Sequence, residues 1–389
     1  MNLITDTQTL AAFCERIAKS EFVTVDTEFM RERTYWPKLC VIQLAGDEEA
    51  AAVDALADDI DLSPVFDLMT DETVLKVFHA ARQDLEIFLH IMDRLPTPVF
   101  DTQIAAMVCG FGDSAGYETL AKKLAGARLD KSSRFTDWSA RPLSDKQISY
   151  ALADVTHLRI VYGKLLKKLS HNGRADWLEE EIETLSSPGT YIQDPQEVFR
   201  RIKSRSSSPR FFAVLRELGA WRELEARRVD VPRGHVVRDE ALCEIAHHTP
   251  STPSDLARTR GLGRRFAEGP AGAAVLAAVG RGLAIPEMDC PEQIKRPDIP
   301  AGLGPLTDLL KVLLKMKCEE SGAAQKLVAS SKDLDLIAAL GEKADVPALR
   351  GWRREVFGAA ALRLRHGETA LMIKGRKLKT VRLGETPKD

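Results

Sequence analysis

The pattern of hydrophobic and polar positions changes its period along the chain. Near the N-terminus, three short runs rich in β-branched or small apolar residues follow one another: Phe22–Val25, Cys40–Ala45 and Ala50–Asp54. The polar separators between them are short, so the runs predict three consecutive strands that form a β-meander.

Helical spacing then alternates with further strand-like runs. It covers Leu62–Met69 and Asp84–Met92, and a third helical segment runs through Met107. Leu75–His79 and Val99–Asp101, which lie between these segments, are typical of buried strands. The order β-β-β-α-β-α-β-α predicts an α/β domain with a mixed sheet.

From Gly116 onward the pattern is helical, with one long helix expected over Ser144–Leu169. Residues 186–189 consist of Ser, Pro and Gly, and residues 203–209 consist of Ser, Pro and basic residues. Both compositions are typical of linkers. Beyond Pro209 the pattern predicts only helices joined by loops.

Three short patterns recur in the same order, roughly ninety residues apart, in the C-terminal half. The pairs are Arg260–Arg265 with Arg350–Arg354, Gly272–Leu276 with Gly358–Leu362, and Arg238-Asp239 with Lys332-Asp333. This recurrence predicts two copies of one helical module. With 389 residues, two or three domains are expected. We expect an N-terminal domain over 1–170, a helical linker over 171–208, helical domains over 209–286 and 305–389, and a linker over 287–304 between them.

Charge divides the chain in two. Residues 1–200 carry 21 Lys and Arg against 33 Asp and Glu, whereas residues 201–389 carry 34 against 24. Two solubilised domains of opposite sign would explain this. An acidic half that holds cations and a basic half that meets a polyanion would explain it equally well. The basic residues gather at Arg264-Arg265, Arg353-Arg354 and Lys374–Lys379.

Composition argues against several classes of protein. The six cysteines are scattered and never form Cys-x-x-Cys, which argues against a disulfide framework or a structural zinc site. No run approaches the roughly 20 apolar residues of a membrane span, so no membrane partner is expected. Residues 1–6 do not resemble a signal peptide. A reducing cytoplasm fits these features best.

Three groups of residues could carry chemistry. Asp26 and Glu28 are two positions apart at the end of the first expected strand, where alternate side chains share a face. Tyr150 and Asp154 are four positions apart on the long helix and also share a face. Asp84 lies near the start of a helix. Alone, each is more often an ordinary surface feature or a helix cap.

Together the groups resemble the tyrosine-containing branch of the proofreading-type 3′→5′ exonuclease superfamily, and within it the ribonuclease D family. The resemblance covers about residues 1–170. It rests on these blocks: Asp26–Phe29, Arg33–Tyr35, Ile42–Leu44, Phe78–Ala80, Asp84–Glu86, Asp101–Gln103, Leu129–Ser132, Asp137-Trp138, Arg141–Leu143 and Tyr150–Asp154. The C-terminal repeats resemble two copies of the helical domain shared by RecQ-type helicases and ribonuclease D (HRDC domain), the second divergent.

The resemblance implies a ribonuclease H-like core and two divalent cations, Mg²⁺ or Mn²⁺, held by four carboxylates: Asp26, Glu28, Asp84 and Asp154. It implies that Tyr150 orients the attacking water, because a phenol with a pKa of about 10 is a poor base at neutral pH. The implied activity is 3′→5′ exoribonuclease, releasing 5′-mononucleotides from the 3′ ends of tRNA precursors and other small structured RNAs.

Several other residues are weaker candidates. Phe29 or Met30 could contact the terminal base, and Lys131 and Arg141 could contact backbone phosphates. His79 is expected to support the site from behind the ligands. Asp101 is expected to cap the helix that follows it.

Two other functions remain open. A DNA 3′→5′ exonuclease could use the same carboxylates, because discrimination depends on contacts to the 2′-OH that spacing does not reveal. A non-catalytic RNA-binding protein is disfavoured, because decay of a site usually removes a ligand and all five site residues are present. No coiled-coil seam is visible, so a monomer is expected.

Overall fold

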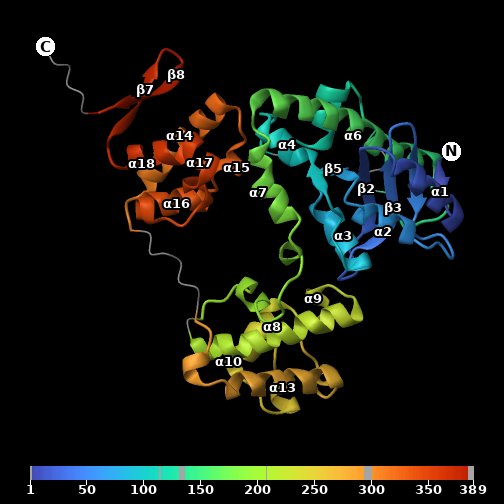
Figure 1. Ribbon diagram of the computed structural model, residues 1–389. Coiled ribbons are helices and arrows are strands. Elements are labelled where there is room, and N and C mark those ends of the chain that lie inside the picture. The colour runs from blue at the N-terminus through green and yellow to red at the C-terminus, as the bar shows by residue number, and fades with distance from the viewer. Residues whose placement is uncertain (1, 114, 131–135, 207, 293–299, 384–389) are drawn as a thin grey trace.

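A computed structural model describes residues 2–113, 115–130, 136–206, 208–292 and 300–383. It contains an N-terminal α/β domain and two helical bodies, each with its own hydrophobic core. In Figure 1, the α/β domain and the second helical body lie on either side of α7, and the first helical body lies below them. No described helix combines the length and the apolar character that crossing a membrane requires.

The N-terminal domain is built on a six-stranded mixed sheet. Its strands are β1 (Leu3–Ile4), β2 (Phe22–Met30), β3 (Lys38–Ala45), β4 (Ala50–Asp54), β5 (Leu75–Phe78) and β6 (Val99–Asp101), in the spatial order β1-β4-β3-β2-β5-β6. β2, β3 and β4 pair antiparallel, which confirms the predicted meander. β1, β5 and β6 join in parallel. The hydrophobic pattern did not predict β1 or the helix α1 (Thr7–Ile17) that follows it.

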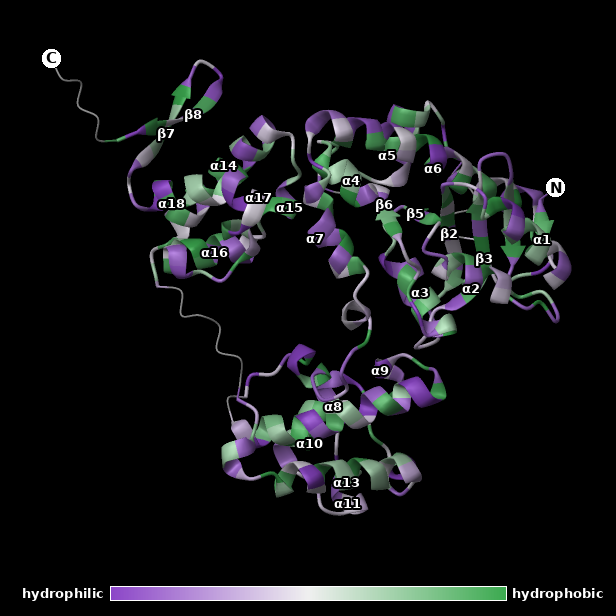
Figure 2. Cartoon of the chain, in the orientation of Figure 1, coloured by the Kyte–Doolittle hydropathy of each residue, from purple (hydrophilic) through white to green (hydrophobic). Residues whose placement is uncertain are grey.

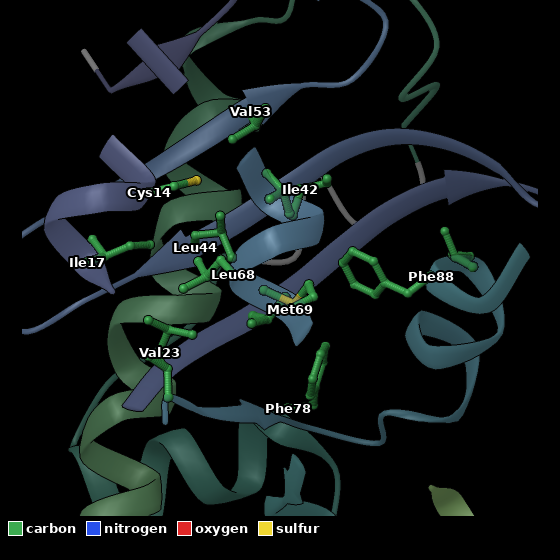
Figure 3. Packing of buried hydrophobic residues seen from close by; sticks show 14 of the residues in the cluster. Cys14, Ile17, Val23, Ile42, Leu44, Val53, Leu68, Met69, Phe78 and Phe88 are labelled. Carbon is green, nitrogen blue, oxygen red and sulfur yellow. The ribbon is translucent and has the colours of Figure 1, made fainter. Parts of the chain in front are cut away.

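The two faces of the sheet are covered by different helices. On one face, α1, α2 (Ser63–Thr70) and α3 (Arg82–Met92) bury the largest core cluster. Figure 3 shows Val23, Ile42 and Leu44 of the sheet meeting Leu68 and Met69 of α2. On the other face lies α6 (Asp145–Asn172), the predicted long helix. α6 begins sharply because Ser144 and Gln147 form a reciprocal capping box, and it ends at a left-handed Gly173.

Shorter elements complete the N-terminal half. They are α4 (Thr102–Val108), α5 (Tyr117–Leu120), a π-helical turn at Ala121–Ala125 and α7 (Asp176–Leu185), followed by 3₁₀ turns at Pro188–Thr190 and Val198–Arg201. Asp101 caps α4 by accepting from the Gln103 N–H at 2.7 Å, as expected.

The first helical domain comprises α8 (Pro209–Val229), α9 (Arg233–Val236), α10 (Asp239–His248), α11 (Pro253–Leu256), α12 (Arg264–Ala267) and α13 (Pro270–Ala284). Apolar faces of α8, α10 and α13 enclose its core, with Leu215, Leu242 and Val275 fully buried.

The second helical domain comprises α14 (Gly304–Ser321), α15 (Gln325–Val328), α16 (Ser331–Leu340), α17 (Gly351–Arg353), a π-helical segment at Arg354–Gly358 and α18 (Ala359–Arg365). It docks on α7, where the rings of Trp177 and Trp352 stack with centroids 4.2 Å apart. The buried Arg353 guanidinium pairs with Glu180 and Glu181 of α7. Residues 171–208 are therefore not merely a linker, because α7 forms this joint.

The expectation of helices alone beyond Pro209 is wrong. The chain ends in an antiparallel hairpin of β7 (Thr369–Lys374) and β8 (Lys377–Arg382). Figure 2 shows hydrophobic and hydrophilic residues mixed along both strands. The apolar residues Ala370–Ile373 form one unbroken run, and the second strand is rich in lysine, so neither strand shows the regular alternation that predicts a strand.

Candidate active site

The site begins with the alternation of β2. Val23 and Val25 face the core cluster under α1, α2 and α3. Thr24 faces the other way, and its hydroxyl donates to the Val155 carbonyl of α6 at 2.8 Å. Asp26 and Glu28 continue the Thr24 face, because side chains in a strand alternate with a period of two. Both carboxylates therefore leave β2 toward α6.

The long helix α6 brings the third carboxylate. Asp154 is buried on the face that meets β2. Asp26, Glu28 and Asp154 each place a carboxylate oxygen within 4.8 Å of the others, and within the described part of the chain they form the one such group with metal-binding character. The structure thus brings together three of the four predicted ligands, from positions far apart in sequence.

The fourth predicted ligand, Asp84, lies beside this cluster but outside it. It sits in the first turn of α3 and is buried. Its Oδ1 accepts from the Thr27 hydroxyl at 2.5 Å, and Thr27 projects from the opposite face of β2. Asp84 does not cap α3, whose first residue is preceded by Ala81. Thr27, which no sequence pattern singled out, therefore orients Asp84 next to the cluster.

Burial and neighbouring acids raise the pKa values of two carboxylates in the site. Burial, and then the neighbouring Asp154, raise the pKa of Asp26 well above its ordinary value. Burial, and then Asp26, raise the pKa of Asp84 in the same way. A cation between these groups would lower both pKa values by favouring the ionised forms. An all-oxygen ligand set suits a hard divalent cation such as Mg²⁺ or Mn²⁺. The residues therefore fit divalent metal.

Two phenols border the carboxylates. Burial, then the charges of Asp154 and Glu28, raise the pKa of Tyr150 far above its ordinary value. Its hydroxyl therefore remains protonated and can donate a hydrogen bond. Tyr117, which no sequence signal singled out, donates to the main-chain carbonyl of Asp154 and thereby braces α6 at the site.

His79 and Asp101 support the site from behind. Burial lowers the pKa of His79 to about 4, so its ring is neutral at physiological pH. The ring lies 3.0 Å from the Thr102 hydroxyl and is tilted against Tyr117. Asp101 accepts from the main-chain N–H groups of Ala80 and Ala81, at 3.0 and 2.9 Å. These bonds fix the turn that leads from β5 into α3 and Asp84.

Two cavities flank the carboxylates. One, of about 280 Å³, is lined by Asp26, His79, Tyr117, Tyr150 and Asp154 together with neighbouring residues. The other, of about 670 Å³, begins at Glu28 and is lined by residues 29–34, Lys38 and residues 136–139. The carboxylates thus lie between a small pocket and a larger, more open one.

The weaker candidates have different surroundings. Phe29 and Met30 line the larger cavity, and each also packs against a core cluster. All five N–H groups of the Arg141 guanidinium donate within the protein, to Asp54 and to three main-chain carbonyls. This engagement argues against the expected phosphate contact, because no donor is left over. Lys131 lies outside the described residues.

Comparison with known proteins gives a consistent result. A family model described as 3′-5′ exonuclease matches residues 1–170, and one described as HRDC domain matches residues 211–279. The ribonuclease D of Gluconacetobacter diazotrophicus is 51% identical over 379 residues, which cover 97% of this chain and 96% of that protein. The ribonuclease D of Nitrobacter hamburgensis is 51% identical over 383 residues, covering 98% and 100% of the two chains.

A solved structure matches along nearly the whole chain. It is that of Escherichia coli RNase D, described as an exoribonuclease involved in structured RNA processing. The TM-score is 0.79 at 30% identity, and the match covers 94% of this chain and 100% of that one. The likeness therefore includes the helical half as well as the carboxylate-bearing domain.

Proposed function

The chain belongs to the ribonuclease D family of 3′→5′ exoribonucleases, and from that premise we propose that it releases 5′-mononucleotides by two-metal-ion hydrolysis at the carboxylate cluster. The observation that carries the proposal is the meeting of Asp26, Glu28 and Asp154 at the mouth of two cavities. Asp84 accepts a hydrogen bond from Thr27, which lies between Asp26 and Glu28 in β2, and would complete the ligand set.

The four carboxylates would hold two divalent cations. Such a pair supplies activation of a water and charge stabilisation on both the attacking and the leaving oxygen at phosphorus. Tyr150 would donate its phenolic proton in a hydrogen bond and so fix the position of the water. Its raised pKa makes it a positioning donor rather than a base. Thr24 would keep α6 in register with β2 during turnover, and Tyr117 of α5 would brace α6 at Asp154.

The two cavities suggest how an RNA strand could bind across the active site. The smaller pocket, next to Tyr150 and Asp154, would take the 3′-terminal nucleotide. The larger cavity, which begins at Glu28, would take the preceding nucleotides. Phe29 or Met30, which line that cavity next to Glu28, would contact the terminal base from its side. The scissile phosphate would then lie over the carboxylates.

We propose RNA, and specifically the 3′ ends of tRNA precursors and small structured RNAs, as the substrate. Support comes from the relatives called ribonuclease D and from the Escherichia coli enzyme described as acting in structured RNA processing. The test is a single-turnover comparison on RNA and DNA oligonucleotides of the same sequence. We expect faster release from RNA. Equal or faster release from DNA would favour a DNA exonuclease with the same site.

We also propose that the second helical domain is a divergent copy of the first. Two glycines of the echoed segments support this. A Cβ placed on Gly272 would lie 2.2 Å from the Ala267 carbonyl oxygen, and a Cβ on Gly358 would lie 2.2 Å from the Ala348 carbonyl oxygen. In both domains, a glycine thus lets a long helix contact the main chain of the preceding turn.

The RNA-binding surface that we propose for the basic half is smaller than the three predicted clusters. Arg353 is buried against α7, so it is not available to RNA. Lys374, Lys377 and Lys379 are exposed on the β7–β8 hairpin, and strand pairing places them on one face. We propose this face as a contact for RNA phosphates, in a monomeric enzyme of the bacterial cytoplasm.

A further inference from the structure

The β2–β3 connection, residues 31–37, joins the carboxylate strand to its neighbour and forms one wall of the larger cavity. Arg31, Glu32, Arg33 and Thr34 all line that cavity, which begins at Glu28. Arg33 is exposed and makes no ion pair with any described residue. The position of this wall therefore limits the path by which an RNA strand can approach Glu28.

The far end of the connection is held by the first helical domain. Asp230 follows α8 in the left-handed conformation, with φ of 50°. Its Oδ1 accepts from the main-chain N–H groups of both Tyr35 and Trp36, at 3.0 and 2.9 Å. One carboxylate oxygen thus fixes two successive peptide groups of the connection.

A second contact lies about two helical turns earlier, at Glu223 of α8. Glu223 is fully buried, and its carboxylate accepts from the Tyr35 hydroxyl and from Arg227 and Arg233. The two guanidinium groups also donate to the Tyr35 oxygen, at 3.2 and 3.0 Å. Burial alone would raise the pKa of Glu223, but hydrogen bonds from Arg233 and Tyr35 outweigh it and lower the pKa to about 2. Glu223 is therefore ionised and fully partnered.

The connection is held on its other side by α3. The rings of Trp36 and His90 stack with centroids 4.0 Å apart and an interplanar angle of 7°. The guanidinium of Arg31 forms a two-pronged pair with Glu86. The connection thus contacts α3, which carries Asp84, on one side and the first helical domain on the other.

We infer that Glu223 and Asp230 are positioning residues for the exonuclease reaction, although both belong to the first helical domain. By holding Tyr35 and Trp36 they fix residues 31–34 as the wall along which nucleotides upstream of the scissile phosphate lie. The inference rests on the proposed function, since it assigns the larger cavity to upstream RNA. The first helical domain then shapes the entrance to the site in addition to any RNA contact of its own.

Two substitutions at one position separate this role from general stability. Asp230→Gly keeps the left-handed backbone without strain and removes the acceptor for both N–H groups. Asp230→Asn keeps an oxygen that can accept both and also tolerates this conformation. Glu225→Ala is the matched control, because Glu225 lies on the same helix and pairs only with the nearby Arg228 among the described residues.

The measurement is kcat and KM in the full-length protein on a dinucleotide and on a longer unstructured single-stranded RNA. For Asp230→Gly we expect kcat/KM on the longer RNA to fall roughly tenfold to a hundredfold, the usual scale for misplaced positioning groups. The dinucleotide places a single nucleotide against this wall, whereas the longer RNA places several, so kcat/KM on the dinucleotide should fall far less. Asp230→Asn and Glu225→Ala should resemble wild type on both substrates.

Tyr35→Phe provides a second variant that removes one hydroxyl and leaves Glu223 with both arginines. It should show a smaller loss than Asp230→Gly, again mainly on the longer RNA. Equal losses on both substrates, no loss on either, or an Asp230→Asn variant as impaired as Asp230→Gly would overturn the inference. A wild-type protein that cleaves neither substrate would instead contradict the proposed function.

Discussion

At the scale of single residues, the proposed site consists of carboxylates whose ionised forms repel one another unless a cation is bound between them. The pKa values of Asp26 and Asp84 are raised by burial and by neighbouring acids. Tyr150 is held beside them as a protonated phenol. In the proposed mechanism this arrangement separates two roles: the carboxylates would hold the cations, and the phenol would position the water.

Tyr150→Phe should isolate the positioning task. It keeps the ring and removes only the hydroxyl, so we expect the single-turnover rate to fall about 10²–10⁴-fold. The Kd for RNA should stay near the wild-type value. The control is Tyr162→Phe, because Tyr162 lies on the same helix but packs against Phe22 and Phe100. Comparable rates for the two variants would remove Tyr150 from the mechanism.

Much of the site could be predicted from sequence, and the reason is its periodicity. Spacing of two on a strand and four on a helix placed Asp26 with Glu28, and Tyr150 with Asp154, on shared faces. Thr27 and Tyr117 could not be predicted, because their roles depend on tertiary contacts with Asp84 and α6. The internal hydrogen bonds of Arg141, which argue against a phosphate contact, could not be predicted for a similar reason: its partners lie up to 101 positions away.

At the scale of elements, the β-meander and the long helix followed from strong patterns, whereas the elements at the two ends of the chain did not. β1 has only two residues, too few for any period. The β7–β8 hairpin combines an unbroken apolar run in one strand with a lysine-rich second strand, so it lacks a regular alternation. Patterns of this length carry little information until pairing with a neighbour selects the conformation.

Glycine substitutions test the packing that the two helical domains share. A Cβ on Gly272 would collide with the Ala267 carbonyl, so Gly272→Ala should destabilise the protein by about 1–3 kcal/mol. Gly280 lies on the same helix with nothing within 4 Å of its added Cβ, so Gly280→Ala should stabilise by about 0.5–1 kcal/mol. Denaturant unfolding of both variants is the measurement. Opposite signs support the close contact, and equal effects would refute it.

Gly358→Ala extends that test to the second helical domain. Its added Cβ would meet the Ala348 carbonyl at the same distance as in the first domain. We expect a loss of stability similar to that of Gly272→Ala. A neutral effect would argue that the two helical domains do not share this contact and that the sequence echo is coincidental.

At the scale of the whole molecule, the acidic and basic halves meet at the β2–β3 connection and at α7. The proposed function gives the two halves separate roles. The acidic half holds the cluster, and the basic half presents the hairpin lysines. Contacts between the halves include ionic and aromatic pairs, as at Arg353 with α7 and at Glu223 with Tyr35. They also include an apolar cluster in which Ala324 and Leu327 pack with Val108 and Leu178. Charge composition suggested this division, but only the fold identifies which basic residues are free to meet RNA.

The salt dependence of RNA binding tests the hairpin surface. Replacing Lys377 and Lys379 with Gln should weaken binding and make the log–log salt slope shallower by roughly 0.7 for each RNA phosphate that the protein no longer neutralises. The control replaces Lys311 and Lys317 with Gln; these lysines pair with Asp308 and Glu320 of α14. Both double variants remove the same charge. Equal slopes for the two would show that the hairpin does not bind RNA.

The most direct test of the central claim is a ladder assay on 5′-labelled RNA with added Mg²⁺ or Mn²⁺. Wild type should shorten the RNA one nucleotide at a time from the 3′ end, release 5′-mononucleotides, and stop when a chelator removes the metal. The same assay should be run on four variants: Asp26→Asn, Glu28→Gln, Asp84→Asn and Asp154→Asn. Each should lose nearly all turnover. The metal-free form of each should unfold no more easily than wild type, because each substitution relieves repulsion between the carboxylates. Wild-type turnover in any one of them at saturating metal would contradict the assigned site.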